Sequence, residues 1–102
     1  MEENNLDALH HVAIPVVSVA AVVEWYTKTF KCRVLYQDES WGFLEFANIR
    51  IALVVPDQHP PHLAFVSDEA ERFGALKTHR DGTRSVYVRD PAGNSVEIMA
   101  RA

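Results

Sequence analysis

Hydrophobic and polar residues alternate in two similar stretches, residues 11–14 and 62–65, which lie 51 positions apart. The first reads His-Val-Ala-Ile and the second His-Leu-Ala-Phe. Alternation with a period of two indicates a strand with one apolar face. Each stretch is followed by a serine that can cap a helix, Ser18 in the first case and Ser67 in the second. The pattern therefore predicts two copies of one module.

Each module continues with a helix and three further strands. Apolar residues at helical spacing predict a first helix from Val19 to Phe30. The second helix is expected to be short, Asp68 to Phe73, because Gly74 is a natural end for it. The strands predicted after the helices are Cys32–Tyr36, Phe43–Phe46 and Ile49–Val55 in the first module, and Ala75–Arg80, Ser85–Arg89 and Ser95–Met99 in the second. The predicted fold class is therefore α+β, with two βαβββ modules and a shortened second helix.

Length and composition predict one domain over residues 1–102. Module one covers about residues 8–56, a proline-rich linker covers 56–61, and module two covers about 61–100. A formal net charge of −4 argues against nucleic-acid and anionic-membrane partners, which need clustered Lys and Arg. The lone Cys32 excludes an internal disulfide, and residues 1–7 lack signal-peptide character. We therefore expect a cytoplasmic protein.

Three side chains at related positions suggest a metal site. Strand alternation places His11, His62 and Glu97 on the polar faces of their strands. Two imidazoles and one carboxylate are a common ligand set for a catalytic divalent ion, because they leave coordination positions open. The repeat places Ala52 at the equivalent of Glu97, and alanine supplies no ligand. We predict one divalent ion, either Mn, Fe, Ni, Co or Zn.

The remaining histidines, His10, His59 and His79, are interpreted as surface or hydrogen-bonded core residues. His59 is a rival ligand because it lies three residues before His62, but it belongs to the proline-flanked linker.

The chain resembles the vicinal oxygen chelate superfamily, which includes glyoxalase I, methylmalonyl-CoA epimerase, extradiol dioxygenases, and fosfomycin- and bleomycin-resistance proteins. The segments that carry the resemblance are residues 9–14, 24–26, 61–65 and 86–98. It implies that the paired βαβββ modules form an open, incomplete β-barrel around the site. Glyoxalase I and the epimerase have Glu or Gln at the position of Ala52, so the resemblance favours the other subgroups.

Extradiol dioxygenases and fosfomycin-modifying enzymes place a functional tyrosine ten residues before the glutamate ligand, and Tyr87 occupies that position here. The resemblance to the fosfomycin enzymes further implies that Lys77, Arg80 and Ser85 bind an anionic substrate group. Two departures from that subgroup are Ala13, where those enzymes have threonine, and residues 81–84, which do not reproduce their potassium-binding loop.

Two functions follow as hypotheses. The first is a metal-dependent lyase, transferase or dioxygenase that binds a small oxygen-rich substrate through two neighbouring oxygens, with Tyr87 donating a hydrogen bond to the bound oxyanion. The alternative is a metal-free, small-molecule-binding protein that resembles the bleomycin-resistance proteins, with Trp41, Phe43 and Tyr87 lining a groove. The short second helix and the resemblance also predict a homodimer. The metal site can then be shared between two chains or complete within one.

Overall fold

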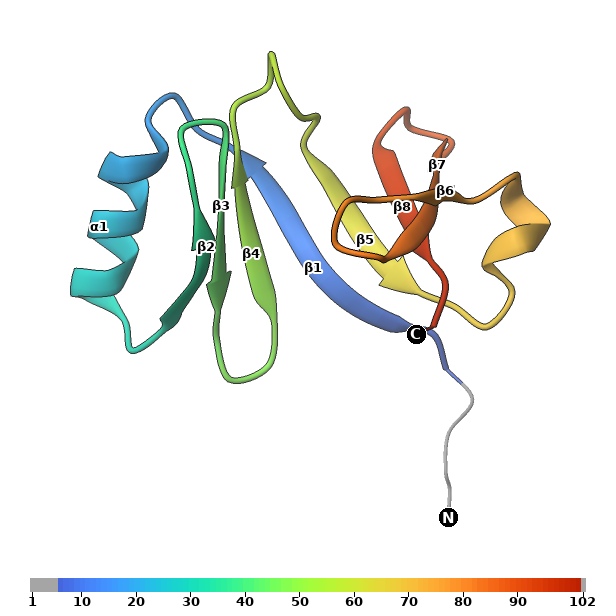
Figure 1. Ribbon diagram of the computed structural model, residues 1–102, viewed down its shortest axis with the longest axis horizontal. Coiled ribbons are helices and arrows are strands. Elements are labelled where there is room, and N and C mark those ends of the chain that lie inside the picture. The colour runs from blue at the N-terminus through green and yellow to red at the C-terminus, as the bar shows by residue number, and fades with distance from the viewer. Residues whose placement is uncertain (1–5, 102) are drawn as a thin grey trace.

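A computed structural model of the chain describes residues 6–101, and its elements form one continuous sheet of eight strands (Figure 1). The strand order is β2-β3-β4-β1-β5-β8-β7-β6. The elements are β1 (Ala8–Pro15), α1 (Val19–Thr29), β2 (Arg33–Gln37), β3 (Trp41–Glu45), β4 (Arg50–Val54), β5 (His62–Val66), the 3₁₀-helix η1 (Ala70–Phe73), β6 (Lys77–Thr78), β7 (Arg84–Arg89) and β8 (Ser95–Met99). The sheet is open, and the predicted α+β class with two βαβββ modules is confirmed.

The two modules have the same internal order and meet at β1 and β5. In each module the last strand runs parallel to the first, β4 beside β1 and β8 beside β5, while β1 and β5 are antiparallel. Ala13 lies opposite Ala52 in the first module, and Ala64 lies opposite Glu97 in the second. Because Ala13 and Ala64 are equivalent in the repeat, this register confirms that Ala52 is the counterpart of Glu97.

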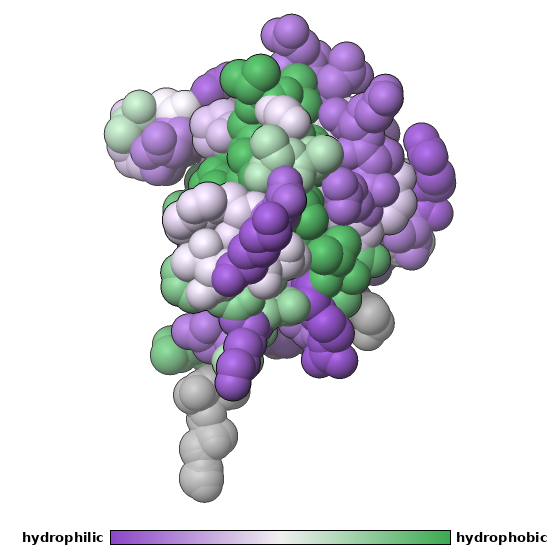
Figure 2. All heavy atoms as spheres, turned by 90° about the vertical axis from the view of Figure 1, so that its left-hand side faces the viewer, coloured by the Kyte–Doolittle hydropathy of each residue, from purple (hydrophilic) through white to green (hydrophobic). Residues whose placement is uncertain are grey.

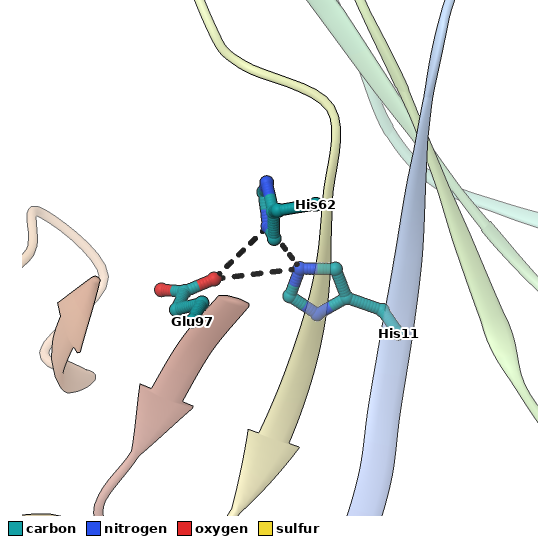
Figure 3. A group of neighbouring side chains, drawn as sticks. All are labelled: His11, His62 and Glu97. Atoms are coloured by element: carbon teal, nitrogen blue, oxygen red, sulfur yellow. Dashed lines mark hydrogen bonds and ion pairs between the residues drawn. The ribbon is translucent and has the colours of Figure 1, made fainter. Parts of the chain in front are cut away.

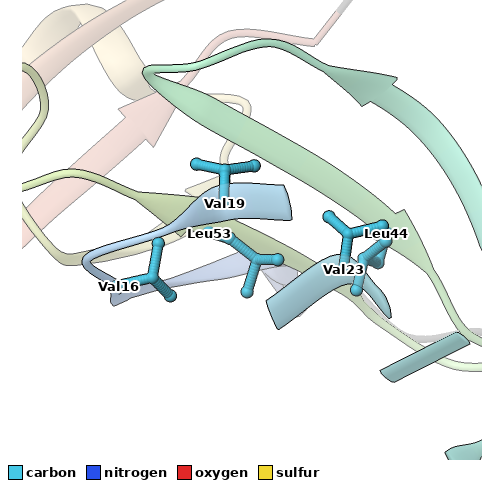
Figure 4. Packing of buried hydrophobic residues seen from close by; sticks show 5 residues of the cluster. All are labelled: Val16, Val19, Val23, Leu44 and Leu53. Carbon is cyan, nitrogen blue, oxygen red and sulfur yellow. The ribbon is translucent and has the colours of Figure 1, made fainter. Parts of the chain in front are cut away.

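The first module has a compact apolar core between α1 and the sheet (Figure 4). The helix begins after Ser18, whose hydroxyl accepts a hydrogen bond from the backbone N–H of Ala21 at 3.2 Å. A Cβ at Gly42 would lie 3.1 Å from Val19, so glycine allows α1 to approach β3 closely. The buried members of this cluster are Val16, Val19, Val23, Leu44 and Leu53.

The outer surface of α1 mixes hydrophobic and hydrophilic residues, as Figure 2 shows from that side. Glu24 and Lys28 form an ion pair of 2.9 Å across one helical turn. Trp25 on α1 and Phe30 at its C-terminal end are both more than half exposed. This face of the first module therefore combines charge with accessible apolar area.

The second module has much less cover. Residues 70–73 form only a single 3₁₀ turn, so the predicted helix from Asp68 starts two residues later and is tighter than an α-helix. Leu63 remains 38% exposed, and Phe73 is also exposed. Among the described residues the two apolar core clusters consist entirely of first-module side chains.

The strand predicted from Ala75 to Arg80 is wrong in length, because β6 contains only Lys77 and Thr78. Residues 79–83 form a tight turn instead. The backbone N–H of His79 donates to the carbonyl of Thr83 at 2.7 Å, and Gly82 has a φ of +90°, which glycine adopts without strain. This turn fixes the position of His79 at the end of the hairpin.

The strand β3 begins at Trp41 and not at the predicted Phe43, because Asp38 forms a tight turn before it. Its carboxylate accepts hydrogen bonds from the backbone N–H groups of Ser40 and Trp41. In the part of the chain that the structure describes, no helix has the length and apolarity required to cross a bilayer. The expectation about residues 1–7 concerns a segment of which residues 1–5 lie outside the described residues.

Candidate metal centre

Three adjacent strands bring His11, His62 and Glu97 together (Figure 3). Because Ile14 packs in the cluster beneath α1, strand alternation places His11 on the opposite face of the sheet. The Nε2 atoms of the two imidazoles are 3.1 Å apart. Oε1 of Glu97 lies 3.1 Å from Nε2 of His62 and 3.6 Å from Nε2 of His11. One chain supplies all three groups, from β1, β5 and β8.

These separations match those of ligands around one ion. Atoms bound to a metal at about 2.1 Å lie about 3.0 Å apart at octahedral angles and about 3.4 Å apart at tetrahedral angles. Three such atoms occupy one side of an ion and leave its other positions open. Ala13 and Ala64, the small inner neighbours of the histidines, are both buried. The donor set and its spacing therefore fit a divalent ion of the predicted kind.

The hydrogen bond on the far side of the His62 ring decides what its Nε2 can do. Nδ1 of His62 lies 2.8 Å from the carbonyl oxygen of Pro60, which only accepts, so Nδ1 carries a proton. In the neutral ring Nε2 then has a lone pair and no hydrogen. This lone pair faces the carboxylate of Glu97, so a positive charge is needed between them, either a proton or a metal ion.

A β-bulge gives His11 a similar support. The pairing of β1 with β5 shifts between Leu9 and His11, and Nδ1 of His10 comes within 2.8 Å of Nδ1 of His11. One of these nitrogens donates and the other accepts. When His11 donates, its Nε2 presents a lone pair to the site. Outer partners of this kind commonly fix the orientation of metal-bound imidazoles.

Glu97 is only 6% exposed, and its two oxygens face different groups. Oε1 faces the two ligand histidines. Oε2 accepts a hydrogen bond of 2.7 Å from the hydroxyl of Ser85, which is 2.6 Å from Nε2 of His79. Each of the three predicted ligands thus has a polar partner outside the candidate centre.

The charges of this cluster shift its pKa values in a consistent way. Burial lowers the pKa of His62, but the hydrogen bonds to Glu97 and to Pro60 outweigh burial and raise that pKa above its ordinary value. Burial lowers the pKa of His11 to about 4, and the neighbouring His62 acts in the same direction. Burial raises the pKa of Glu97, but the hydrogen bonds from His62 and Ser85 hold it well below its usual range. At neutral pH Glu97 is therefore ionised and His11 is neutral.

Tyr87 lies beside the ligands, directly opposite Glu97 in the β7–β8 pairing. Its ring contacts that of His62 edge to face, with centroids 5.3 Å apart. Burial raises the pKa of the Tyr87 hydroxyl, and the charge of Glu97 raises it further. The hydroxyl therefore keeps its proton and can donate it in a hydrogen bond.

The three residues predicted to bind an anion do not share one environment. Lys77 and Arg80 are exposed, whereas Ser85 is 1% exposed and donates its hydroxyl hydrogen to Glu97. Arg80 belongs to the β6–β7 turn. The hydrogen bond to Asp38 raises the pKa of Tyr36, whereas the positive charge of Arg80 lowers it.

Aromatic side chains continue from the candidate centre across the first module. The rings of Phe43 and His11 pack edge to face with their centroids 5.4 Å apart, and the ring centroids of Trp41 and Phe43 are 5.5 Å apart. Tyr36 stacks on Trp41 at 4.9 Å. The ring centroid of His59, the rival ligand, lies 6.4 Å from that of Trp41, and His59 is not part of the convergent group.

Sequence reasoning passed over two histidines that support the site. His79 has the same strand parity as Ser85 across the Asp81-Gly82 turn, so alternation along the hairpin would have placed it near Glu97. No comparable signal existed for His10, because strict alternation places it on the opposite face from His11. The bulge that redirects His10 is visible only in the structure.

No protein-family model matches this chain, and no curated protein matches it by sequence. Solved structures do. Methylmalonyl-CoA epimerase from Mycobacterium tuberculosis superposes with a TM-score of 0.76 and 16% identity, over 100% of this chain and 93% of the epimerase. The 2,3-dioxygenase LapB from a Pseudomonas species superposes with a TM-score of 0.70 and 18% identity, over 92% of this chain and 42% of the dioxygenase.

A third structure, a glyoxalase/bleomycin resistance protein/dioxygenase superfamily member from Vibrio splendidus, superposes with a TM-score of 0.66 and 11% identity, over 89% of this chain and 97% of the other. At these identities the similarity concerns the fold. The repeat of two βαβββ modules, their edge-to-edge pairing through β1 and β5, and these superpositions identify the fold of the chain as that of the vicinal oxygen chelate superfamily.

Proposed function

We propose that the protein is a divalent-metal-dependent enzyme of the vicinal oxygen chelate type, which binds a small oxygen-rich substrate through two neighbouring oxygens. His11, His62 and Glu97 would hold the ion, one of Mn, Fe, Ni, Co or Zn. When bound, the ion would supply Lewis acidity for an oxyanion that develops on the substrate.

The observation that carries this proposal is the convergence of acceptor atoms. When His62 is neutral, it directs a lone pair at an ionised carboxylate 3.1 Å away, because its only N–H is then committed to Pro60. Such an arrangement is unfavourable unless a cation or a proton lies between the two atoms. A divalent ion would satisfy His11, His62 and Glu97 at once, whereas a single proton satisfies one pair.

Other groups near the ligands have properties that suit a substrate site. Tyr87 is 44% exposed, so its protonated hydroxyl is accessible to a bound oxyanion. Trp41 and Phe43 would offer flat apolar surface on the opposite side of the candidate ion. Lys77 and Arg80 remain candidates for anionic parts of a substrate.

The test is metal binding by the purified protein. After chelator treatment, the chain should take up about one Zn²⁺ or Co²⁺ ion, with bond lengths of about 2.0–2.2 Å by X-ray absorption. His62→Ala should abolish uptake. His59→Ala, which removes the rival histidine of the proline-flanked linker, should leave uptake unchanged.

Failure of the unsubstituted protein to bind any of the five ions would reject this proposal. It would favour the alternative, a metal-free protein that binds small molecules, for which the continuous rings of Tyr36, Trp41 and Phe43 are the supporting feature. Normal uptake by His62→Ala would show instead that the ligands are misassigned.

The homodimer and the cytoplasmic location also belong to this proposal. Exposed Leu63 and Phe73 on the poorly covered module provide apolar area that a second copy would bury. Sedimentation velocity in dilute solution tests the dimer, and a monomer would contradict it. To ask whether a site is shared, a His11→Ala chain is mixed with a Glu97→Ala chain. Restored uptake requires a shared site, whereas a site within one chain predicts no recovery.

A further inference from the structure

The carboxylate of Glu97 is held from behind by two residues that are not ligands in the proposed centre. Ser85 lies on β7 and His79 lies at the end of the β6–β7 hairpin, so both approach Glu97 from the side away from β5. Oε2 receives the Ser85 hydroxyl, while Oε1 remains directed at His11 and His62.

The direction of each hydrogen bond follows from the number of hydrogens that each group can donate. Ser85 has one hydroxyl hydrogen, and an ionised carboxylate only accepts, so Ser85 donates to Oε2 of Glu97. The Ser85 oxygen can then only accept from His79, so Nε2 of His79 carries the hydrogen of that 2.6 Å contact. The chain of donors runs in one direction, from His79 through Ser85 to Glu97.

Backbone pairing and turn hydrogen bonds hold the segments that carry both donors. Ser85 is 1% exposed and pairs with Met99 of β8 and Lys77 of β6. The turn at residues 79–83 locks His79, and the Asp81 carboxylate reinforces it by accepting hydrogen bonds from the backbone and hydroxyl of Thr83. The hairpin thus places the imidazole within hydrogen-bond distance of the buried hydroxyl.

We propose that Ser85 and His79 are positioning residues that occupy one oxygen of Glu97 and so restrict it to binding the metal ion through the other. This inference rests on the proposed metal centre, and it gives Ser85 a role toward Glu97 in place of contact with substrate. A carboxylate free to rotate can chelate an ion with both oxygens and fill a position that substrate needs. Holding Oε2 in a hydrogen bond keeps that position open.

The experiment compares Co²⁺ binding in Ser85→Ala, His79→Leu, His79→Gln and the control His59→Leu. Loss of outer partners of metal ligands typically weakens metal affinity about 10–100-fold. We expect a loss of this size in Ser85→Ala and His79→Leu, and none in His59→Leu. The side-chain amide of glutamine can donate from nearly the position of Nε2, so His79→Gln should recover most of the affinity.

A second readout separates positioning from general destabilisation. The visible absorption of bound Co²⁺ weakens as the coordination number rises, so Ser85→Ala and His79→Leu should show weaker bands at full occupancy, whereas His79→Gln should resemble the unsubstituted protein. Urea unfolding of the metal-free variants checks that each one folds. If Ser85→Ala does not fold, the comparison of His79→Gln with His79→Leu still tests the inference.

The outcomes are distinguishable. If the unsubstituted protein binds no ion, the proposed function fails and this inference fails with it. If that protein binds Co²⁺ and His79→Leu and Ser85→Ala match it in affinity and spectrum, the metal centre stands and only the positioning role is overturned. An equal loss in His79→Leu and His79→Gln would likewise overturn the donor role of His79.

Discussion

The two modules share one topology but divide their tasks. The first has an eleven-residue helix, and all five buried residues of the larger apolar cluster belong to it. The second has only a four-residue 3₁₀ turn, yet it supplies His62 and Glu97 together with Ser85 and His79. A duplicated module can therefore place most of its apolar packing in one copy and most of its polar chemistry in the other.

The largest expected effect tests the unequal division of apolar packing, by removing apolar volume from each module in turn. Leu53 is fully buried under α1, so Leu53→Ala should lower the free energy of unfolding by about 2–5 kcal/mol. Leu63 is already 38% exposed on the second module, and Leu63→Ala should cost only about 1 kcal/mol. Urea denaturation of both variants measures the difference, and equal losses would contradict the unequal division of the core.

The pH dependence of metal affinity tests the chemistry assigned to the second module. The pKa of His62 is raised above its ordinary 6.5, that of His11 is lowered, and that of Glu97 is lowered, so His62 is the first of the three proposed ligands to gain a proton as the pH falls. A metal ion needs the neutral imidazole. Affinity should therefore be constant above the raised pKa of His62 and fall about tenfold for each pH unit below it.

Isothermal titration with Zn²⁺ in buffers of different ionisation enthalpy checks this expectation, because it counts the protons released on binding. About one proton per ion is expected below the pKa of His62 and none well above it. Affinity that does not change as the pH is lowered from about 8 to about 6 would show that His62 is not the titrating ligand.

The exposed part of the candidate site predicts a smaller effect. Tyr87→Phe removes one hydroxyl and keeps the ring that packs against His62. The variant should fold and bind metal normally but lose about 0.5–3 kcal/mol in affinity for an oxyanionic ligand such as oxalate, because one hydrogen bond to a charge is lost. Competition for the visible spectrum of the Co²⁺ protein measures this. Unchanged oxalate affinity would leave Tyr87 with a packing role only.

The smallest expected effect concerns the helix that distinguishes the first module. Ser18→Ala removes the hydroxyl that accepts from the N–H of Ala21, and it should cost about 0.5–2 kcal/mol of stability. Ser18→Asp retains an acceptor at the same place and is the matched control. Thermal unfolding should rank Ser18→Ala below the other two proteins, and a stability equal to theirs would mean that the cap contributes nothing.

The repeat itself could be read from the sequence because its strands follow a simple rule. Alternation in residues 11–14 and 62–65 and the helical spacing from Val19 onward predicted the modules, and the equivalence of Ala52 with Glu97 followed from counting. The clustering of His11, His62 and Glu97 followed in the same way, since each lies on the polar face of its strand and the three strands are adjacent.

The features that escaped prediction depend on local backbone irregularity. A bulge at His10 shifts the strand register, and a tight turn at residues 79–83 ends β6 early; both bring a histidine toward a proposed ligand. The short β6 has the same origin, because the turn takes residues that alternation alone would assign to a strand. Nothing in the hydrophobic pattern indicates the bulge at His10, whereas alternation continued through the β6–β7 hairpin would have indicated His79.

Because the proposed ligands lie on both sides of the boundary between the modules, an ion bound there would affect the stability of both modules. His11 lies on one side of the β1–β5 ladder, and His62 and Glu97 lie on the other. An ion that binds only the native chain adds its free energy to every opening that separates these strands. If the halves open as one cooperative unit, backbone amides of α1 would exchange with heavy water more slowly once the ion is bound, although no atom of that helix touches it. Exchange rates in the helix would thus report whether the two copies still behave as a single folding unit.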